Sequence, residues 1–269
     1  MKDLIKNSIK NLYSFLPKNL KSFIRNLYNN NSGPITVSKN GKKNALIIYL
    51  KQPFLFDHKV VTHCNIYESL IIKEELSSLG YALDAVDYRY NREIDYSKYD
   101  LILGFGDLFS KSFLSKNVKD DIKRICYSTG TYIDSWNNAE VFRLQYLNNR
   151  FNLKLTPERP WGWDMSTFSF LNSDGVIQTG NQWTKSTFDH LNIKNFFVVP
   201  VPTITKENKY IPIEEMSGKD FIFFSGAGAV FKGLDLVIEA FDSIDSNSNL
   251  YIYGPFDEEQ NFMSIFRPI

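Results

Sequence analysis

The chain has 269 residues, of which 43% are hydrophobic and 15% aromatic, and its formal net charge is +1. This length is ample for a packed core and exceeds one typical domain. The near-neutral charge argues against nucleic acid as the main partner, because a phosphate backbone requires a broad basic surface. Two cysteines, Cys64 and Cys126, indicate no disulfide framework and no metal site. Without a spanning apolar run or a signal-peptide core, we expect a cytoplasmic protein.

The first 31 residues form a basic segment. Six lysines and arginines stand against one acid, Asp3, which makes the net charge of this segment +5. Apolar residues recur every three or four positions on both sides of Pro17, and this spacing predicts two short amphipathic helices. Such helices suit peripheral contact with the inner face of an anionic membrane. They suit equally well a helical pair docked on the protein's own surface, so both readings stay open.

A linker-like run from Asn29 to Pro34 precedes a domain that we place at residues 45–202. Short apolar runs alternate there with helical stretches, which predicts a Rossmann-like, doubly wound parallel sheet. A helix from about Asn65 to Leu79 follows the first strand and ends at Gly80. A hinge is expected from Pro200 to Pro212. The expected strands are Ala45–Leu50, Tyr81–Asp87, Leu101–Gly104, Arg124–Ser128, Gly175–Gln178 and Phe196–Val199.

Polar residues and glycines in the loops after these strands are candidates for an acceptor site, because doubly wound sheets bind ligands beyond the carboxyl ends of their strands. We regard His63 and Glu68 as the candidates for catalysis. Ordinary structural roles also fit: Asn65 and Thr184 could cap helices, Gly104 could form a tight turn, and His63 could be a loop histidine. The acceptor-side candidates are Asn65, Gly104, Asp107, Thr129, Gly130 and Asn181.

A phosphate-binding pattern extends from Asp220 to Gly254. It consists of an apolar strand, Phe221–Phe224, a glycine-rich loop, an amphipathic helix starting near Lys232, and a second strand, Leu250–Tyr253. Small loop residues let backbone N–H groups approach an anion, and the positive end of the helix points to the same place. We therefore expect a βαβ unit that holds phosphate.

Two better-known phosphate loops do not fit this segment. A Walker loop requires Lys-Ser or Lys-Thr after its last glycine, whereas Gly233 is followed by Leu234. A dinucleotide fingerprint requires a glycine where Phe231 stands and an acid at the end of the second strand, where Gly254 stands.

The remaining pattern resembles the donor half of group 1 glycosyltransferases with the GT-B fold. The resemblance implies a GT-B-like α/β protein, with residues 213–269 as the first βαβ unit of a second Rossmann-like domain. It also implies a nucleotide-diphosphate sugar as substrate, with no cofactor and no metal. The matching residues are Ser225-Gly226, Lys232-Gly233-Leu234-Asp235, Ala240-Phe241 and Tyr253-Gly254-Pro255. The residues implied to bind the donor are Ser225, Gly226, Gly228, Lys232, Gly233 and Gly254.

The chain departs from the family's pattern in three places. The loop after the first strand, Lys51 to Phe54, has no glycine, and no histidine follows the fourth strand. The family's Glu-x7-Glu element is missing, since Glu258 and Glu259 are adjacent. We therefore expect the donor domain to be truncated and sugar transfer to depend on the part that is missing.

The resemblance implies a retaining hexosyltransferase that moves a sugar from a nucleotide-diphosphate sugar to a glycan or lipid-linked saccharide in surface polysaccharide synthesis. Two alternatives stay open. One is a non-catalytic, truncated relative that binds a membrane or a partner. The other is a GT-B sugar epimerase, which would not need the basic segment.

Overall fold

The structure is a computed structural model of the chain. It describes Pro17, Leu20 and residues 33–55, 63–157, 167–203, 220–226, 228–244 and 248–254. The helices predicted for residues 1–31, most of the predicted hinge and the Glu258–Glu259 pair lie outside the described residues. The chain divides into two compact units, one of Met1–Gly130 with Trp163–Ile204 and one of Thr131–Gly162 with Thr205–Ile269. This division differs from the predicted one, in which residues 131–162 belong to the first domain.

A seven-stranded sheet forms the first unit, in the order β1-β3-β2-β4-β5-β6-β7. β1 pairs antiparallel with β3, and all the other pairings are parallel. The six predicted strands are confirmed, whereas β1 was not predicted, because its four residues lie beside turn-forming residues and are mostly half-buried. The strands are β1 Ile35–Ser38, β2 Lys43–Tyr49, β3 Tyr81–Asp87, β4 Leu101–Gly104, β5 Lys123–Ser128, β6 Gly175–Thr179 and β7 Phe196–Val199.

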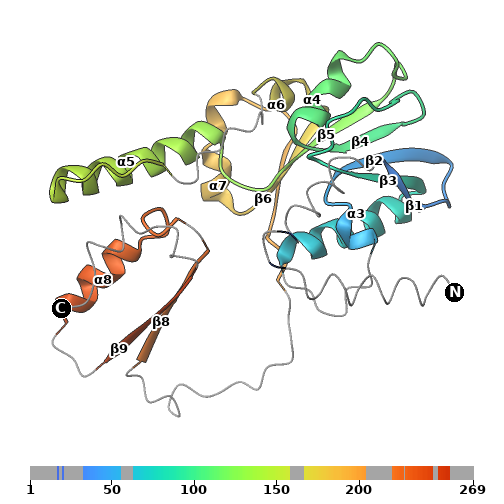
Figure 1. Cartoon of the computed structure of the whole chain (residues 1–269). Helices are drawn as coiled ribbons and strands as arrows, with labels where there is room; N and C mark the ends of the chain where they lie inside the picture. Colours follow the sequence, from blue (N-terminus) through green and yellow to red (C-terminus); the bar gives the residue numbers. More distant parts are fainter. Residues whose placement is uncertain are drawn as a thin grey trace, which may run out of the picture. The chain divides into compact units, whose positions relative to one another are not determined.

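Helices lie on both faces of this sheet. The strand order reverses between β2 and β4, and parallel crossovers are right-handed, so α3 lies on one face and α4 and α6 on the other (Figure 1). Residues 45–49 of β2 are fully buried between these layers. The helices are η1 Gln52–Phe54, α3 Cys64–Ser78, α4 Gly106–Leu114, α6 Thr167–Asn172, α7 Gln182–Ser186 and η2 Asp189–Leu191.

The second unit is a βαβ crossover with one additional long helix. Its strands β8, Asp220–Phe224, and β9, Asn249–Tyr253, pair in parallel through α8, Leu234–Asp242. Both predicted strands are confirmed. The helix begins two residues later than expected, because Gly233 precedes it in a left-handed conformation with φ of 80°.

The long helix α5, Ile133–Phe151, belongs to this second unit although it stands between β5 and β6 in the sequence. Leu144 and Leu147 of α5 pack in one apolar cluster with Ala229, Val230 and Leu234. The loop and α8 therefore share their core with a helix from a distant part of the chain. Within the described residues, no helix is both long and apolar enough to cross a membrane.

Candidate functional site

The loop between β8 and α8 folds back on itself in a series of turns. The Ser225 amide donates to the Tyr253 carbonyl at 3.0 Å, and the Lys232 amide donates to the Gly228 carbonyl at 2.9 Å. Gly228 and Gly233 have φ values of 90° and 80°, which glycine adopts without strain. The turns themselves therefore require two of the glycines predicted for donor binding.

This loop has an exposed residue near each end, and its middle is buried. Gly226 and Lys232 are exposed, whereas Ala229 and Val230 lie in the core. A side chain at Gly226 would meet nothing within 4 Å, so neighbouring atoms do not account for a glycine there. Because β8 and β9 are parallel, the exposed Gly254 lies at the same edge of the sheet. The structure thus gathers all six predicted donor residues in and beside one loop.

The Lys232 side chain lies beside an aromatic pair. Its Nζ atom is 5.6 Å from the centroid of the Phe231 ring, and Phe231 stacks against Trp136 of α5 with centroids 4.6 Å apart. A cation at this distance from an aromatic face is attracted to it. The ring of Phe231 therefore attracts the Lys232 ammonium group, and Trp136 packs against that ring.

Two ion pairs join α5 to α8. Asp235, in the first turn of α8, is fully buried and pairs with Arg143. One turn later, both carboxylate oxygens of Glu239 accept from Nη1 of Arg150, at 2.6 and 2.7 Å. Sequence reasoning missed Arg143, which is 92 positions from Asp235. The available signal was Asp235 itself, because an acid on a buried helix face requires a partner.

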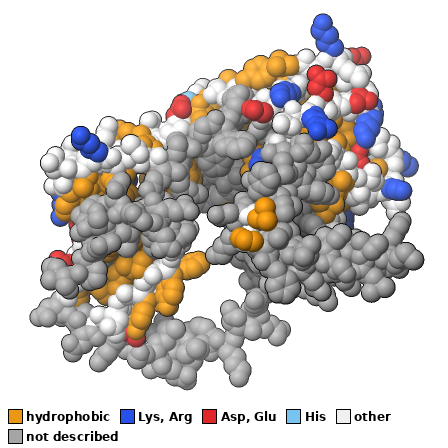
Figure 2. Space-filling view, in the orientation of Figure 1, with side chains coloured by type: hydrophobic (Ala, Val, Ile, Leu, Met, Phe, Trp, Pro, Cys, Tyr) orange, Lys and Arg blue, Asp and Glu red, His pale blue; other side chains and the backbone are white. Residues whose placement is uncertain are grey.

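The face of the β8–β9 sheet that points away from α8 is apolar and exposed (Figure 2). Phe221 and Phe223 face α8, since Phe221 makes an edge-to-face contact with Phe241 and Phe223 packs against the core cluster. The alternate residues point to the other face. They are Ile222, Phe224, Tyr251 and Tyr253, with exposures from 45% to 82%.

In the first unit, the predicted acceptor-side residues share one edge of the sheet. They follow four parallel strands whose carboxyl ends lie side by side, and the point where the strand order reverses is at this edge. His63, Asn65 and Glu68 follow β2, Gly104 and Asp107 stand at the end of β4, Thr129 and Gly130 follow β5, and Asn181 follows β6.

Glu68 is held in a buried hydrogen-bond cluster. Its carboxylate accepts from the Tyr49 hydroxyl at 2.5 Å and also interacts with Tyr127. Burial, strengthened by the hydrogen bonding and charge of Glu68, raises the pKa of both tyrosine hydroxyls well above the usual range. Burial, with a contribution from Glu68, also raises the pKa of the Cys64 thiol. These contacts give Glu68 a structural role, which is to link α3 to the buried tyrosines of β2 and β5.

His63 is not a loop histidine but the N-cap of α3. Its Nδ1 atom accepts from the Asn65 amide at 3.3 Å, and it lies 3.6 Å from Cys64 Sγ. Asn65 is therefore within the first turn rather than a cap. The Nδ1 atom of His63 is thus engaged in a structural hydrogen bond at the start of the helix.

The remaining acceptor-side candidates also have identifiable structural roles. Asn181, not Thr184, caps α7, because its Oδ1 accepts from the Thr184 amide at 3.0 Å. Gly104 lies in β4 rather than in a turn, and a Cβ there would be 2.4 Å from the Ile48 carbonyl oxygen. Asp107 is exposed in the first turn of α4, where a negative charge suits the helix dipole. Thr129 and Gly130 are half-buried after β5.

Sequence reasoning missed a buried charge pair at the same edge. Lys51 follows β2 and Asp87 ends β3, and both are fully buried. Burial lowers the pKa of Lys51, and the charge of Asp87 partly opposes this shift. Asp87 Oδ1 accepts from Arg89 Nε at 3.0 Å, while Oδ2 has no hydrogen-bond partner among the described residues. A lysine directly after a buried strand was the available signal.

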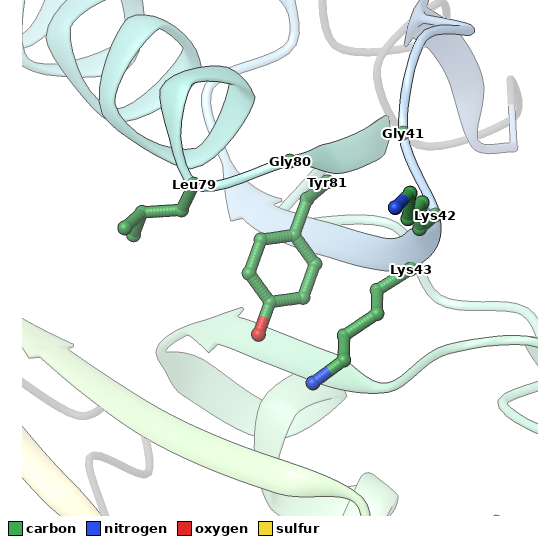
Figure 3. A pocket seen from close by; sticks show the side chains of 6 residues that line it. All are labelled: Gly41, Lys42, Lys43, Leu79, Gly80 and Tyr81. Carbon is green, nitrogen blue, oxygen red and sulfur yellow. The ribbon is translucent and has the colours of Figure 1, made fainter.

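A pocket of about 540 Å³ lies at the other end of the strands, beside the amino ends of β2 and β3 (Figure 3). Its lysines stand near the C-terminal end of α3, which favours positive charge. A Cβ at Gly41 would lie 2.0 Å from the Ala82 amide nitrogen, so the backbones meet closely there. The pocket is lined by Gly41, Lys42, Lys43, Leu79, Gly80 and Tyr81.

Comparison of the chain with models of protein families, with curated proteins and with solved structures found no match in any of the three. Within the described ranges, no three His, Cys, Asp or Glu side chains gather as a metal site.

Proposed function

We propose that this chain takes part in sugar transfer from a nucleotide-diphosphate sugar to a glycan or lipid-linked acceptor, in a GT-B arrangement. The observation that supports this most is the exposed Lys232 two positions before α8, on the same loop as the exposed Gly226. Lysine, small loop residues and a helix start together suit a phosphate group. The second unit is then the donor-binding part.

In this proposal, the donor's diphosphate lies at the loop from Ser225 to Gly233. As the bond to the sugar breaks, the diphosphate gains negative charge. Lys232 and the positive end of α8 would stabilise that charge, which lowers the barrier because they are already in place before the reaction. The ring of Phe231, against which Trp136 packs, attracts the lysine side chain.

The first unit would receive the acceptor at the carboxyl edge of its sheet, where doubly wound sheets bind their ligands. Exposed or half-exposed polar groups suited to sugar hydroxyls stand there on Asp107, Thr129 and Asn181. We further propose that the basic segment of residues 1–31 holds the protein peripherally at the cytoplasmic face of an anionic membrane, where lipid-linked acceptors are found.

Calorimetric titration of the full chain with UDP and GDP tests the donor site. Lys232→Ala removes a charge-assisted contact and should weaken binding by about 1.5–3 kcal/mol. UMP and GMP should bind more weakly than the diphosphates, because the second phosphate carries much of the recognised charge. Lys154, exposed just after α5 in the same unit, supplies the control. Lys154→Ala should bind as the parent does, and equal affinity of Lys232→Ala and the parent would contradict the proposal.

A further inference from the structure

We infer that Arg143 neutralises Asp235 so that the start of α8 can accept a diphosphate. This inference rests on the proposed function and adds to it a residue from α5. Arg143 does not contact the diphosphate in this account. It is a positioning residue that acts through the carboxylate of Asp235.

Asp235 is placed where its charge matters to an anion. It lies in the first turn of α8, three positions after Lys232, and its side chain is only 1% exposed. One carboxylate oxygen pairs with Arg143, and the other, Oδ1, has no hydrogen-bond partner among the described residues. Within the part of the chain that the structure describes, the charge of Asp235 is thus balanced by Arg143.

An unbalanced carboxylate at this point would oppose anion binding. The start of α8 and Lys232 attract a diphosphate, whereas a bare Asp235 would repel it from the same turn. The repulsion is stronger than between surface charges, because Asp235 is buried and water screens it poorly. The guanidinium of Arg143 removes that repulsion and leaves the positive end of the helix to act on the ligand.

The packing of α5 keeps Arg143 in this place. Trp136, about two turns before it, stacks on Phe231 of the loop, and Leu144 and Leu147 pack against the loop and α8. The side chain of Arg143 is 29% exposed, so it reaches the buried Asp235 from the surface of the unit.

A second ion pair between the same helices provides a matched control. Arg150 pairs with Glu239 one turn further along α8, away from the loop, and both side chains are more exposed than Asp235. Removing Arg150 also breaks an α5–α8 contact, but the carboxylate that remains is partly exposed and one turn further from the helix start. A purely structural account predicts that both arginines matter to ligand binding in the same way.

The test is calorimetric titration of the full chain with inorganic pyrophosphate and, separately, with UDP. Arg143→Ala should weaken both by roughly tenfold, the size of one poorly screened charge. Asp235→Asn should strengthen both a few-fold. The double variant Arg143→Ala/Asp235→Asn should return to within about threefold of the parent, and Arg150→Ala should bind as the parent does. Thermal unfolding of each variant shows whether it is folded.

Several outcomes would overturn the inference. They are parent-like binding by Arg143→Ala, equally weak binding by the double variant, and a loss in Arg150→Ala as large as that in Arg143→Ala. If Arg143→Ala does not fold, Asp235→Asn decides, and binding no tighter than the parent's rejects the inference. Failure of the parent itself to bind pyrophosphate and UDP would instead reject the proposed function, and this inference with it.

Discussion

The two units both alternate strands with helices, but their strands are buried to different extents. In the first, β2 lies between β3 and β4 inside a seven-stranded sheet, and its residues 45–49 are fully buried. In the second, two strands leave one face open, where Phe224 is 82% exposed. A two-stranded sheet is marginal by itself. The second unit therefore depends on α5, which supplies core residues and two ion pairs.

The difference extends to the polar groups inside each unit. The first unit buries a tyrosine and a carboxylate together, since the Tyr49 hydroxyl of a strand donates to Glu68 of a helix. The second unit places one buried carboxylate, Asp235, against an arginine of another helix. A loop held in this way depends on a distant part of the chain. Substitutions in α5 should therefore change the stability of the loop.

The largest expected effect comes from emptying the shared core of the second unit. Leu234→Ala removes a fully buried side chain that packs with Leu144 and Leu147, and such truncations cost about 2–5 kcal/mol. Hydrogen exchange should rise in α5, α8 and the loop, and stay slow in β2 and β4. Leu236→Ala, on the exposed side of the same helix, should change stability by less than about 0.5 kcal/mol.

Equal loss of protection in both units after Leu234→Ala would contradict the comparison, because it would mean that the chain unfolds as one body. Loss confined to α8, with α5 unchanged, would show that α5 does not share the core of the second unit.

A smaller effect is expected from alkaline pH, and it should fall on the first unit. Burial raises the pKa of Tyr49, Tyr96, Tyr99 and Tyr127, all in that unit. Unfolded tyrosines ionise near pH 10, so the folded state holds these protons more tightly. Stability should therefore be retained below about pH 10 and fall as the pH rises above it.

Urea unfolding at a series of pH values between 8 and 11 measures this effect. Tyr49→Phe removes one of the titrating groups, so its free energy of unfolding should fall less steeply with pH. The variant should also lose about 1–3 kcal/mol at pH 8, because Glu68 loses a buried hydrogen bond. If the free energy of unfolding falls as steeply with pH in Tyr49→Phe as in the parent, Tyr49 does not contribute to the pH dependence.

The strands other than β1 were predictable because each is a short apolar run bounded by turn residues. The loop with Lys232 was predictable because its small residues are consecutive. The assignment of α5 to the second unit was not, since the contact between Arg143 and Asp235 joins residues 92 positions apart. The caps were misplaced by a few residues, because His63 and Asn181 compete for that role with polar neighbours. Lys51 and Asp87 could be recognised as neighbouring buried charges only from the sheet order, which places the ends of β2 and β3 side by side.

The account rests on the claim that the ligand binds at the loop of the second unit. Hydrogen exchange of the full chain with and without saturating UDP tests this directly, because it compares both regions in one experiment. We predict slower exchange in peptides that cover residues 224–234 and the facing part of α5. Slower exchange confined to the carboxyl edge of the first sheet, at residues 63–68, 104–107 and 128–130, with no change at the loop, would contradict it.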